Sequence, residues 1–280
     1  MPQMLARDNW RFAQVAPKTD HMKVDTPPEH WRPFFTHGGE RIARWLILCD
    51  HAANTVPPWV GGGDLGLPPE DMGRHIAWDP GAAGVAKHLA DALGAPAVFA
   101  NFSRLVIDPN RGTDDPTLVM RIYDQTIIPA NRHVGPADIE TRIDNAYAPY
   151  NDEVARLAAR QDDIVIVSVH SFTPQLRARP PRPWHIGLLF AEDDRLSRPL
   201  LRGLQCQGDV VVGENEPYSG ALAGDTIDRH ALQLGRQNTL IEIRNDLISR
   251  VEDQRAWAER LAPLLVTALD QADQTEKQHG

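Results

Sequence analysis

Short apolar runs alternate along this chain with segments whose apolar residues recur at helical spacing. That pattern is typical of an α/β domain. The strongest run, residues 164–169, is almost wholly β-branched and predicts a buried strand. Further strands are predicted at residues 45–49, 95–100, 105–107, 186–190, 209–212 and 239–243. We therefore predict an α/β fold, a single three-layer domain whose mainly parallel or mixed sheet is flanked by helices.

Helical spacing predicts helices over residues 80–93, 136–161, 197–204, 226–234 and 251–270. In the first of them, Asp79 is a candidate N-cap, Pro80 suits the first helical position and Gly94 provides a stop. The stretch 109–136 is polar and rich in Asp, Arg, Asn and Pro. It predicts a long loop of the kind that carries function.

The length of 280 residues, with 42% hydrophobic positions, is enough for one large domain with a sizeable core. Residues 1–40 show few periodic apolar positions, so we predict an N-terminal arm followed by one domain over residues 41–280. The formal net charge of -9 argues against nucleic acid or an anionic membrane surface as the main partner. A local group of arginines can still bind a small anion, and the oligomeric state stays open.

The two cysteines, Cys49 and Cys206, are too few for a disulfide framework or a four-cysteine zinc site. No apolar run approaches the ~20 residues that cross a bilayer. The first residues also lack the apolar centre of a secretory signal. These features predict a protein of the reducing cytoplasm.

Polar residues gather directly after the predicted strands. Five strands end in such residues, among them Asp50, His51 and Asn54, then Arg104, Asp108, Asn110 and Arg111, then His170, then Glu214, and finally Glu242 and Arg244. In open α/β sheets, ligands bind in the crevice outside the carboxyl ends of the strands. A single residue of this kind is often only a cap or a turn former, but five strands together predict a site.

His51 and His170 are the sharpest pair, because each follows an apolar strand that fixes its backbone. Two imidazoles, one carboxylate and an open position for water make a catalytic zinc site. Asp79, Asp50 or a glutamate are the candidates for the carboxylate. The alternative is a pair of hydrogen-bonded histidines at strand ends.

Glu242 and Arg244 are two residues apart on a predicted strand, so they share one face. A carboxylate there can act as a general base, and an arginine can hold a carboxylate or an oxyanion. The alternative is a mutual ion pair at a strand end. Arg104, Arg111 and Arg244 around one crevice of an acidic protein predict an anionic substrate.

These segments together resemble the N-formylglutamate amidohydrolase family. The resemblance covers roughly residues 45–270 and is carried by residues 49–54, 78–81, 102–111, 169–172 and 241–246, of which Ser103-Arg104 with Asp108-Pro109-Asn110-Arg111 is the most specific part. It implies a zinc-carboxypeptidase-like fold, an amidohydrolase domain over residues 41–280, and metal-dependent hydrolysis of a small anionic N-acyl amino acid.

The resemblance also implies roles for individual residues. His51, Asp79 and His170 become ligands of zinc or another divalent transition metal, Glu242 the general base, and Arg104, Asn110, Arg111 and Arg244 the substrate contacts. Residues 50–54 read Asp-His-Ala-Ala-Asn, whereas the histidine-degradation enzymes of the family carry a Pro-His-Ser-Gly type of motif. Asn54, three residues after His51, is a poor zinc ligand, so the third ligand stays open.

Our leading hypothesis is a metal-dependent amidohydrolase that converts N-formyl-L-glutamate to formate and L-glutamate, as in histidine degradation. A hydrolase for a different N-acyl or N-formimino amino acid is the first alternative. A non-catalytic binder or sensor of small dicarboxylates on the same fold is the second.

Overall fold

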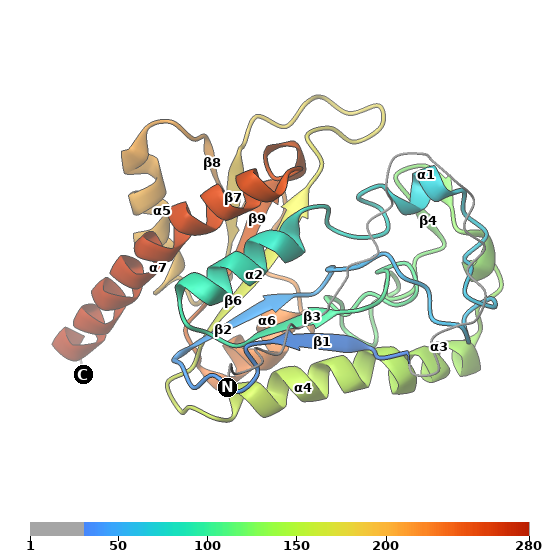
Figure 1. The fold of residues 1–280 in the computed structure, drawn as a ribbon, viewed down its shortest axis with the longest axis horizontal. Coiled ribbons are helices and arrows are strands. Elements are labelled where there is room, and N and C mark those ends of the chain that lie inside the picture. The colour runs from blue at the N-terminus through green and yellow to red at the C-terminus, as the bar shows by residue number, and fades with distance from the viewer. Residues whose placement is uncertain (1–30, 280) are drawn as a thin grey trace, which may run out of the picture.

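A seven-stranded mixed sheet forms the centre of the molecule in this computed structural model, which describes residues 31–279 (Figure 1). The strand order is β1-β3-β2-β6-β9-β7-β8. Its strands are β1 (Phe34–His37), β2 (Trp45–Cys49), β3 (Ala97–Ala100), β6 (Val165–Phe172), β7 (Ile186–Leu189), β8 (Val212–Glu214) and β9 (Asn238–Arg244). The four central strands run parallel, while β1 joins β3 and β7 joins β9 antiparallel. The predicted three-layer α/β fold is confirmed.

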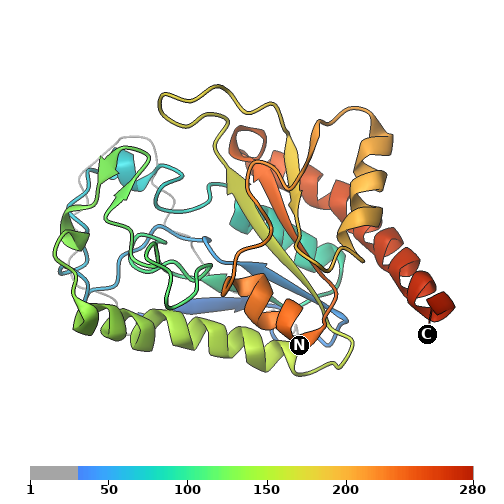
Figure 2. The same cartoon turned by 180° about the vertical axis from the view of Figure 1, so that it is seen from behind.

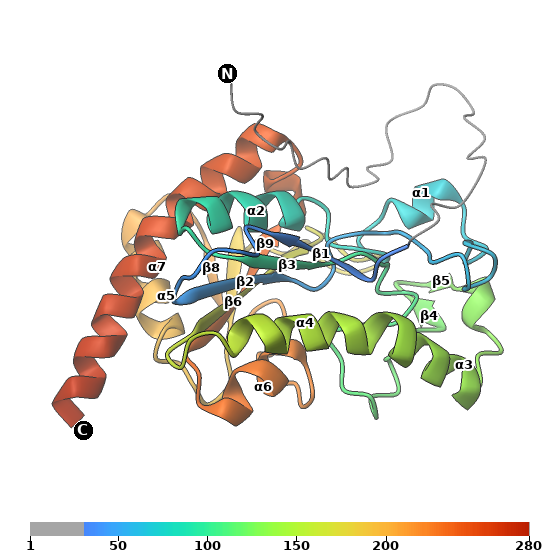
Figure 3. The ribbon, with the colours of Figure 1, turned by 60° about the horizontal axis from the view of Figure 1, so that its bottom comes forward.

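Helices cover both faces of this sheet (Figure 3). One face carries α2 (Ala82–Ala92), α5 (Ser197–Gln207) and the long α7 (Val251–His279). The other carries α4 (Ala148–Ala158) and α6 (Thr226–His230), which lie in front in the view from behind (Figure 2). Helix α3 (Pro136–Arg142) continues through a π-helical turn, Ile143–Tyr147, into α4, and α1 (Pro69–Met72) is a single turn. Among residues 31–279, no helix combines the length and apolar character that a bilayer crossing requires.

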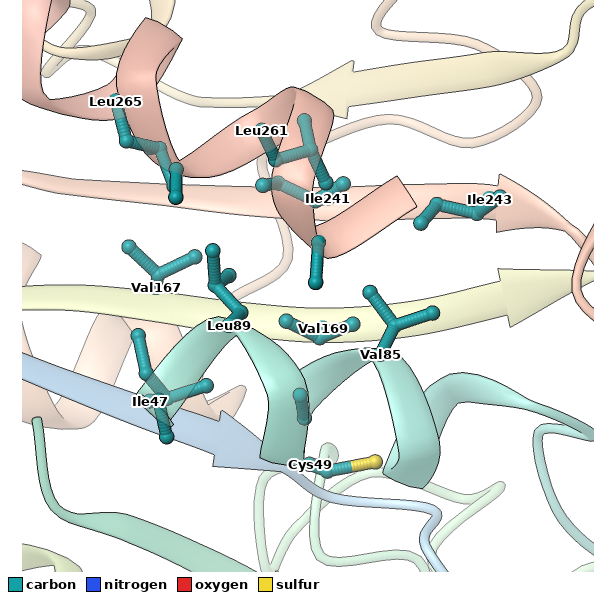
Figure 4. Close-up of a cluster of buried hydrophobic side chains, with 14 of the residues drawn as sticks. Ile47, Cys49, Val85, Leu89, Val167, Val169, Ile241, Ile243, Leu261 and Leu265 are labelled. Atoms are coloured by element: carbon teal, nitrogen blue, oxygen red, sulfur yellow. The ribbon is translucent and has the colours of Figure 1, made fainter. Parts of the chain in front are cut away.

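Successive residues of each strand point to opposite faces of the sheet, and the residues that point toward α2 and α7 are apolar. On this face the strand residues Ile47, Cys49, Val167, Val169, Ile241 and Ile243 pack against the helix residues Val85, Leu89, Leu261 and Leu265 (Figure 4). Helix α2 ends as predicted, since Gly94 adopts a left-handed φ of 61° and Ala95 N donates to Ala90 O. This apolar layer holds the strands rigidly and leaves their opposite face for polar side chains.

The structure differs from the sequence-based predictions at one strand, one helix cap and one strand boundary. Residues 105–107 belong to a turn region rather than a strand, and their apolar side chains are buried in the same apolar cluster as residues of α4. Asp79 does not cap α2, which begins after Gly81. The strand predicted at 209–212 begins only at Val212.

Two further strand pairs were not predicted. The last part of the predicted arm contains β1, which pairs with β3, so the sheet begins before residue 41. Residues 1–30 lie outside the described part. Within the predicted loop 109–136, β4 (Ile122–Tyr123) and β5 (Thr126–Ile127) form a hairpin. Its tip residues, Asp124 and Gln125, have φ values of 41° and 63°, which such tight hairpin turns require.

Candidate metal centre and active site

The carboxyl ends of β2, β6 and β9 bring the predicted site residues together. His51 is the second residue after β2, and His170 lies on β6. Glu242 of β9 is the register partner of His170. Asp79 arrives from the loop before α2, where its backbone N–H donates to the carbonyl of His51 over 2.9 Å. The topology thus turns four positions that are distant in sequence into neighbours.

His51, Asp79 and His170 form a compact and fully buried set of donors. One ligand atom from each lies within 4.8 Å of the others. Asp79 Oδ2 is 3.3 Å from His51 Nδ1 and 2.9 Å from His170 Nδ1. Two imidazole nitrogens and a carboxylate are donors that suit a divalent transition metal. The residues therefore fit the metal that the sequence predicts.

The electrostatics of this set favour a positive charge. Burial alone would lower the pKa of His170, but its hydrogen bonds with Asp50 and Asp79 raise that pKa well above the usual value. Burial likewise works against the charge of Asp79, yet the neighbouring histidines hold its pKa below the usual range. The same carboxylates would also stabilise a bound cation.

Two further carboxylates hold the outer nitrogens of the histidine rings. His51 Nε2 lies 2.7 Å from Asp108, and His170 Nε2 lies 3.0 Å from Asp50. A carboxylate bound to the outer ring nitrogen fixes the tautomer and directs the other nitrogen toward a metal. Sequence reasoning offered Asp50 as a metal ligand and gave Asp108 no role of its own.

Asp50 is itself held by hydroxyl groups. Tyr150 and Thr226 each donate to Oδ1 over 2.8 Å, and Ser168 donates to Oδ2 over 2.8 Å. Burial alone would raise the pKa of Asp50, but the contact with His170, helped by His51 and the hydroxyl of Thr226, keeps that pKa low. Nothing in the spacing of Tyr150 or Thr226 signals this role, since both belong to helices that are remote in sequence.

Glu242 is a buried carboxylate beside the donor set, and its Oε2 has no hydrogen-bond partner among the described residues. Burial, with the nearby charge of Asp79, raises the pKa of Glu242 to about 7. An unpaired carboxylate with such a pKa is well placed to accept and release a proton near neutral pH. The mutual ion pair with Arg244 that served as the alternative is not formed.

A cavity of about 120 Å³ opens onto these groups. The predicted residues on its wall are His51, Arg104, Asn110, Arg111, His170 and Glu242. Sequence reasoning missed its other members, which are Tyr123, Leu189, Tyr218, Ser219, Gly220, Leu222, Asp225 and Leu240. Most of these come from two connecting segments, around residues 123 and 218–225, where no periodic pattern identifies a buried face.

The predicted arginines differ in what they bind. Arg104 donates from Nε and Nη2 to Asp108, over 3.2 and 2.8 Å. Arg111 lies on the wall and contacts Thr117 and the carbonyl of Asn110. Arg244 is not on the wall, because its guanidinium pairs with Asp246 at 2.8 Å. The structure therefore brings together all predicted site residues except Arg244.

The family profile of N-formylglutamate amidohydrolases matches residues 43–249 of this chain. A crystal structure of the gene product Atu2144 from Agrobacterium tumefaciens is similar, with 34% sequence identity over 87% of this chain and 97% of that chain, at a TM-score of 0.81. N-formylglutamate amidohydrolase from Ralstonia eutropha JMP134 has the same fold. It shares 19% identity over 88% of this chain and 100% of that chain, at a TM-score of 0.61. A search of curated proteins gave no match.

The fold, the site and these comparisons define a hydrolase that acts on amide bonds. The chain belongs to the N-formylglutamate amidohydrolase family. The resemblance found in the sequence motifs is thereby confirmed.

Proposed function

We propose that this protein is a metal-dependent hydrolase of small N-acyl amino acids, with N-formyl-L-glutamate as the reference substrate of the family. The observation that supports this proposal is the buried set of His51, Asp79 and His170 beside the unpaired carboxylate of Glu242. The metal is proposed to be zinc. Membership of the family supports a cytoplasmic role in amino-acid breakdown, such as histidine degradation.

His51 and His170 would hold the metal through Nδ1 and Asp79 through its carboxylate, while Asp108 and Asp50 keep the outer ring nitrogens in place. A divalent transition metal at this position would supply Lewis acidity, which lowers the pKa of water and polarises the acyl oxygen.

Glu242 would carry the proton through the reaction. Its carboxylate accepts a proton from the attacking water, whose oxygen forms the new bond to the acyl carbon. The C–N bond then breaks, and Glu242 returns the proton to the amine nitrogen, so the products are the free acid and the amino acid. A pKa of about 7 lets the same group act first as a base and then as an acid.

Asn110 and Arg111 would hold the carboxylate of the amino acid. Asn110 Oδ1 accepts from Thr226 N, and its NH₂ group, which donates to no residue in the range 31–279, would donate to the substrate from the cavity wall. Arg111 adds a cation on the same wall. Arg104 would orient Asp108 and contact the acyl group. Arg244 would contribute indirectly, because it donates to the carbonyl groups of Arg182 and Trp184 over 3.4 Å.

The test is metal-dependent turnover. Purified protein is analysed for bound metals, stripped with a chelator, and reloaded with zinc, manganese or cobalt. Formate and acetate release are then followed from N-formyl-, N-formimino- and N-acetyl-glutamate and -aspartate. We expect turnover that is lost on stripping and restored by metal. Full activity in the stripped protein would contradict metal dependence, and binding without any product would favour the sensor function.

A further inference from the structure

Asp225 is a carboxylate on the cavity wall for which the proposed reaction has no use. It is 5% exposed, and one of its oxygens accepts from Asp228 N over 2.7 Å at the start of α6. Its other oxygen accepts no hydrogen bond from residues 31–279, and no arginine, lysine or histidine in that range forms an ion pair with it. Burial raises its pKa to about 6, and the nearby charges of Asp50 and Asp228 add to this effect.

Of the arginines on the cavity wall, Arg111 is the less tightly paired, because its Nε lies 3.9 Å from Asp115 and its other contacts are Thr117 and the carbonyl of Asn110. Within the described part of the chain, Arg104 and Arg111 are the arginines on its wall. Arg104 is bound to Asp108 through two nitrogens and lies 3.5 Å from Asp79. Arg244, which sequence reasoning expected here, is paired with Asp246 away from the wall. Arg111 and Asn110 can therefore bind one carboxylate, whereas an N-acyl glutamate carries two.

The surroundings of Asp225 are unfavourable for a second carboxylate. The wall that carries Asp225 includes three leucines, Leu189, Leu222 and Leu240, beside polar residues such as Tyr218 and Ser219. Two carboxylates brought together in a buried cavity repel each other more strongly than in water. An N–H group there would instead donate to the free oxygen of Asp225 and satisfy it.

We propose that Asp225 determines specificity, by favouring N-acyl amino acids with one carboxylate and an uncharged, hydrogen-bond-donating side chain over N-acyl dicarboxylic amino acids. This inference rests on the proposed hydrolase function and narrows its substrate class. The carboxamide side chains of glutamine and asparagine have the required chemistry, since their NH₂ group donates where glutamate and aspartate present a negative charge. Asp225 thus contacts the substrate side chain and takes no part in the proton transfers.

The test compares two substrates that differ only in the terminal group. The values of kcat/KM for N-formyl-L-glutamine and N-formyl-L-glutamate are measured with the metal-loaded protein at pH 7.5. We expect the glutamine compound to be preferred at least tenfold. Asp225→Asn should reduce this preference about tenfold or more, mainly by lowering KM for the glutamate compound.

Two further variants control this comparison. Asn is a good N-cap, so Asp225→Asn retains the acceptor for Asp228 N, and Asp225→Ser offers a second capping residue if folding fails. Glu252→Gln removes a carboxylate from the first turn of α7, which is off the cavity wall, so it should leave the preference unchanged.

A preference of the native protein for glutamate, or an unchanged ratio in Asp225→Asn, would overturn the inference. If neither compound releases formate, the proposed hydrolase function itself is contradicted. Calorimetric titration of the same two compounds then decides on Asp225 alone. Tighter binding of the glutamine compound, lost in Asp225→Asn, supports its role, and equal binding contradicts it.

Discussion

The two faces of the central strands differ sharply in polarity, although alternate residues of the same strands form them. The face toward α2 and α7 is built mainly from aliphatic side chains, with one buried cysteine, Cys49 (Figure 4), and the aromatic rings of Trp45 and Phe99. On the opposite face, the same strands present Ser168, His170 and Glu242 beside a deep apolar layer. The first face gains stability from apolar burial. The second also buries charges, which are tolerated because each is hydrogen-bonded or paired.

Glu242 is the exception to that rule, and this makes the comparison informative. Asp50 and Asp108 accept hydrogen bonds on both carboxylate oxygens, whereas Glu242 Oε2 is buried without a partner in the part of the chain that the structure describes. A buried, unsatisfied polar atom costs stability and needs a functional reason. We infer that the unpaired carboxylate of Glu242 lowers the stability of the polar face but provides a proton acceptor. The apolar face supplies most of the stability of the fold.

The largest effect is expected from Glu242→Gln. This substitution keeps the size of the side chain and removes the proton acceptor, so kcat should fall roughly 10²–10⁴-fold. KM should change little, because the lost interaction belongs to the transition state. Steady-state kinetics and metal analysis check both statements. Glu252→Gln on the first turn of α7 is the matched control, and a folded, metal-loaded Glu242→Gln protein with native kcat would end the catalytic role.

On the apolar face, Leu265→Ala should act on stability alone. Leu265 is fully buried, and removal of such a side chain costs about 2–5 kcal/mol of unfolding free energy. Urea unfolding measures this loss, with Val266→Ala as the control, because Val266 is exposed and should change stability by less than ~0.5 kcal/mol. A change of kcat by more than tenfold in the folded Leu265→Ala protein would show that the two faces are coupled.

The apolar face could be predicted from the sequence because its signal is local. Apolar runs such as residues 45–49 and 164–169 predict buried strands, and the helical spacing of apolar residues in 80–93 predicts α2. Where the prediction was wrong, tertiary packing prevailed over the local pattern. Residues 105–107 are apolar because their turn is buried, which an apolar run of three residues cannot distinguish from a strand.

The polar face could be predicted only in part. His51, His170 and Glu242 follow apolar strands, so their meeting at one sheet edge could be inferred. Tyr218 and Asp225 lie in a connection without periodicity, and their place on the wall depends on how that segment folds back. Arg244 shows the reverse error, because alternation along the strand predicted it beside Glu242, whereas its guanidinium pairs with Asp246.

Asp50 and Asp108, the carboxylates that bind the outer ring nitrogens of the histidines, are expected to affect metal binding on the polar face. In Asp50→Asn, an NH₂ group can replace the oxygen that faces His170 Nε2. The ring must then carry its proton on Nδ1, the nitrogen that would bind the metal. We expect zinc affinity to fall about 10–100-fold, the usual effect of losing such a partner. Competition with a chromogenic chelator measures it. Tyr150→Phe retains the carboxylate and should weaken zinc binding less, and the opposite order would contradict this role for Asp50.

The smallest expected effect is a loss of folding stability at acidic pH, which we expect to arise from residues of the polar face. His230 of α6 is buried beside Asn151, and burial, reinforced by Arg229, lowers its pKa from 6.5 to about 4. Between these values the unfolded chain binds the proton and the folded chain does not, so stability falls as the pH drops through this window. At 1.36 kcal/mol per pKa unit, the loss from pH 7 to pH 5 is about 2 kcal/mol.

Urea unfolding of the native protein and of His230→Gln at pH 7 and pH 5 tests this prediction. Gln can still donate to Asn151 but has no proton to gain, so the variant should lose about 2 kcal/mol less on acidification than the native protein. His133→Gln, at an exposed position, serves as the control and should show the native pH dependence. If His230→Gln and the native protein lose stability equally, the acid sensitivity lies elsewhere on the polar face, and His230 is not its source.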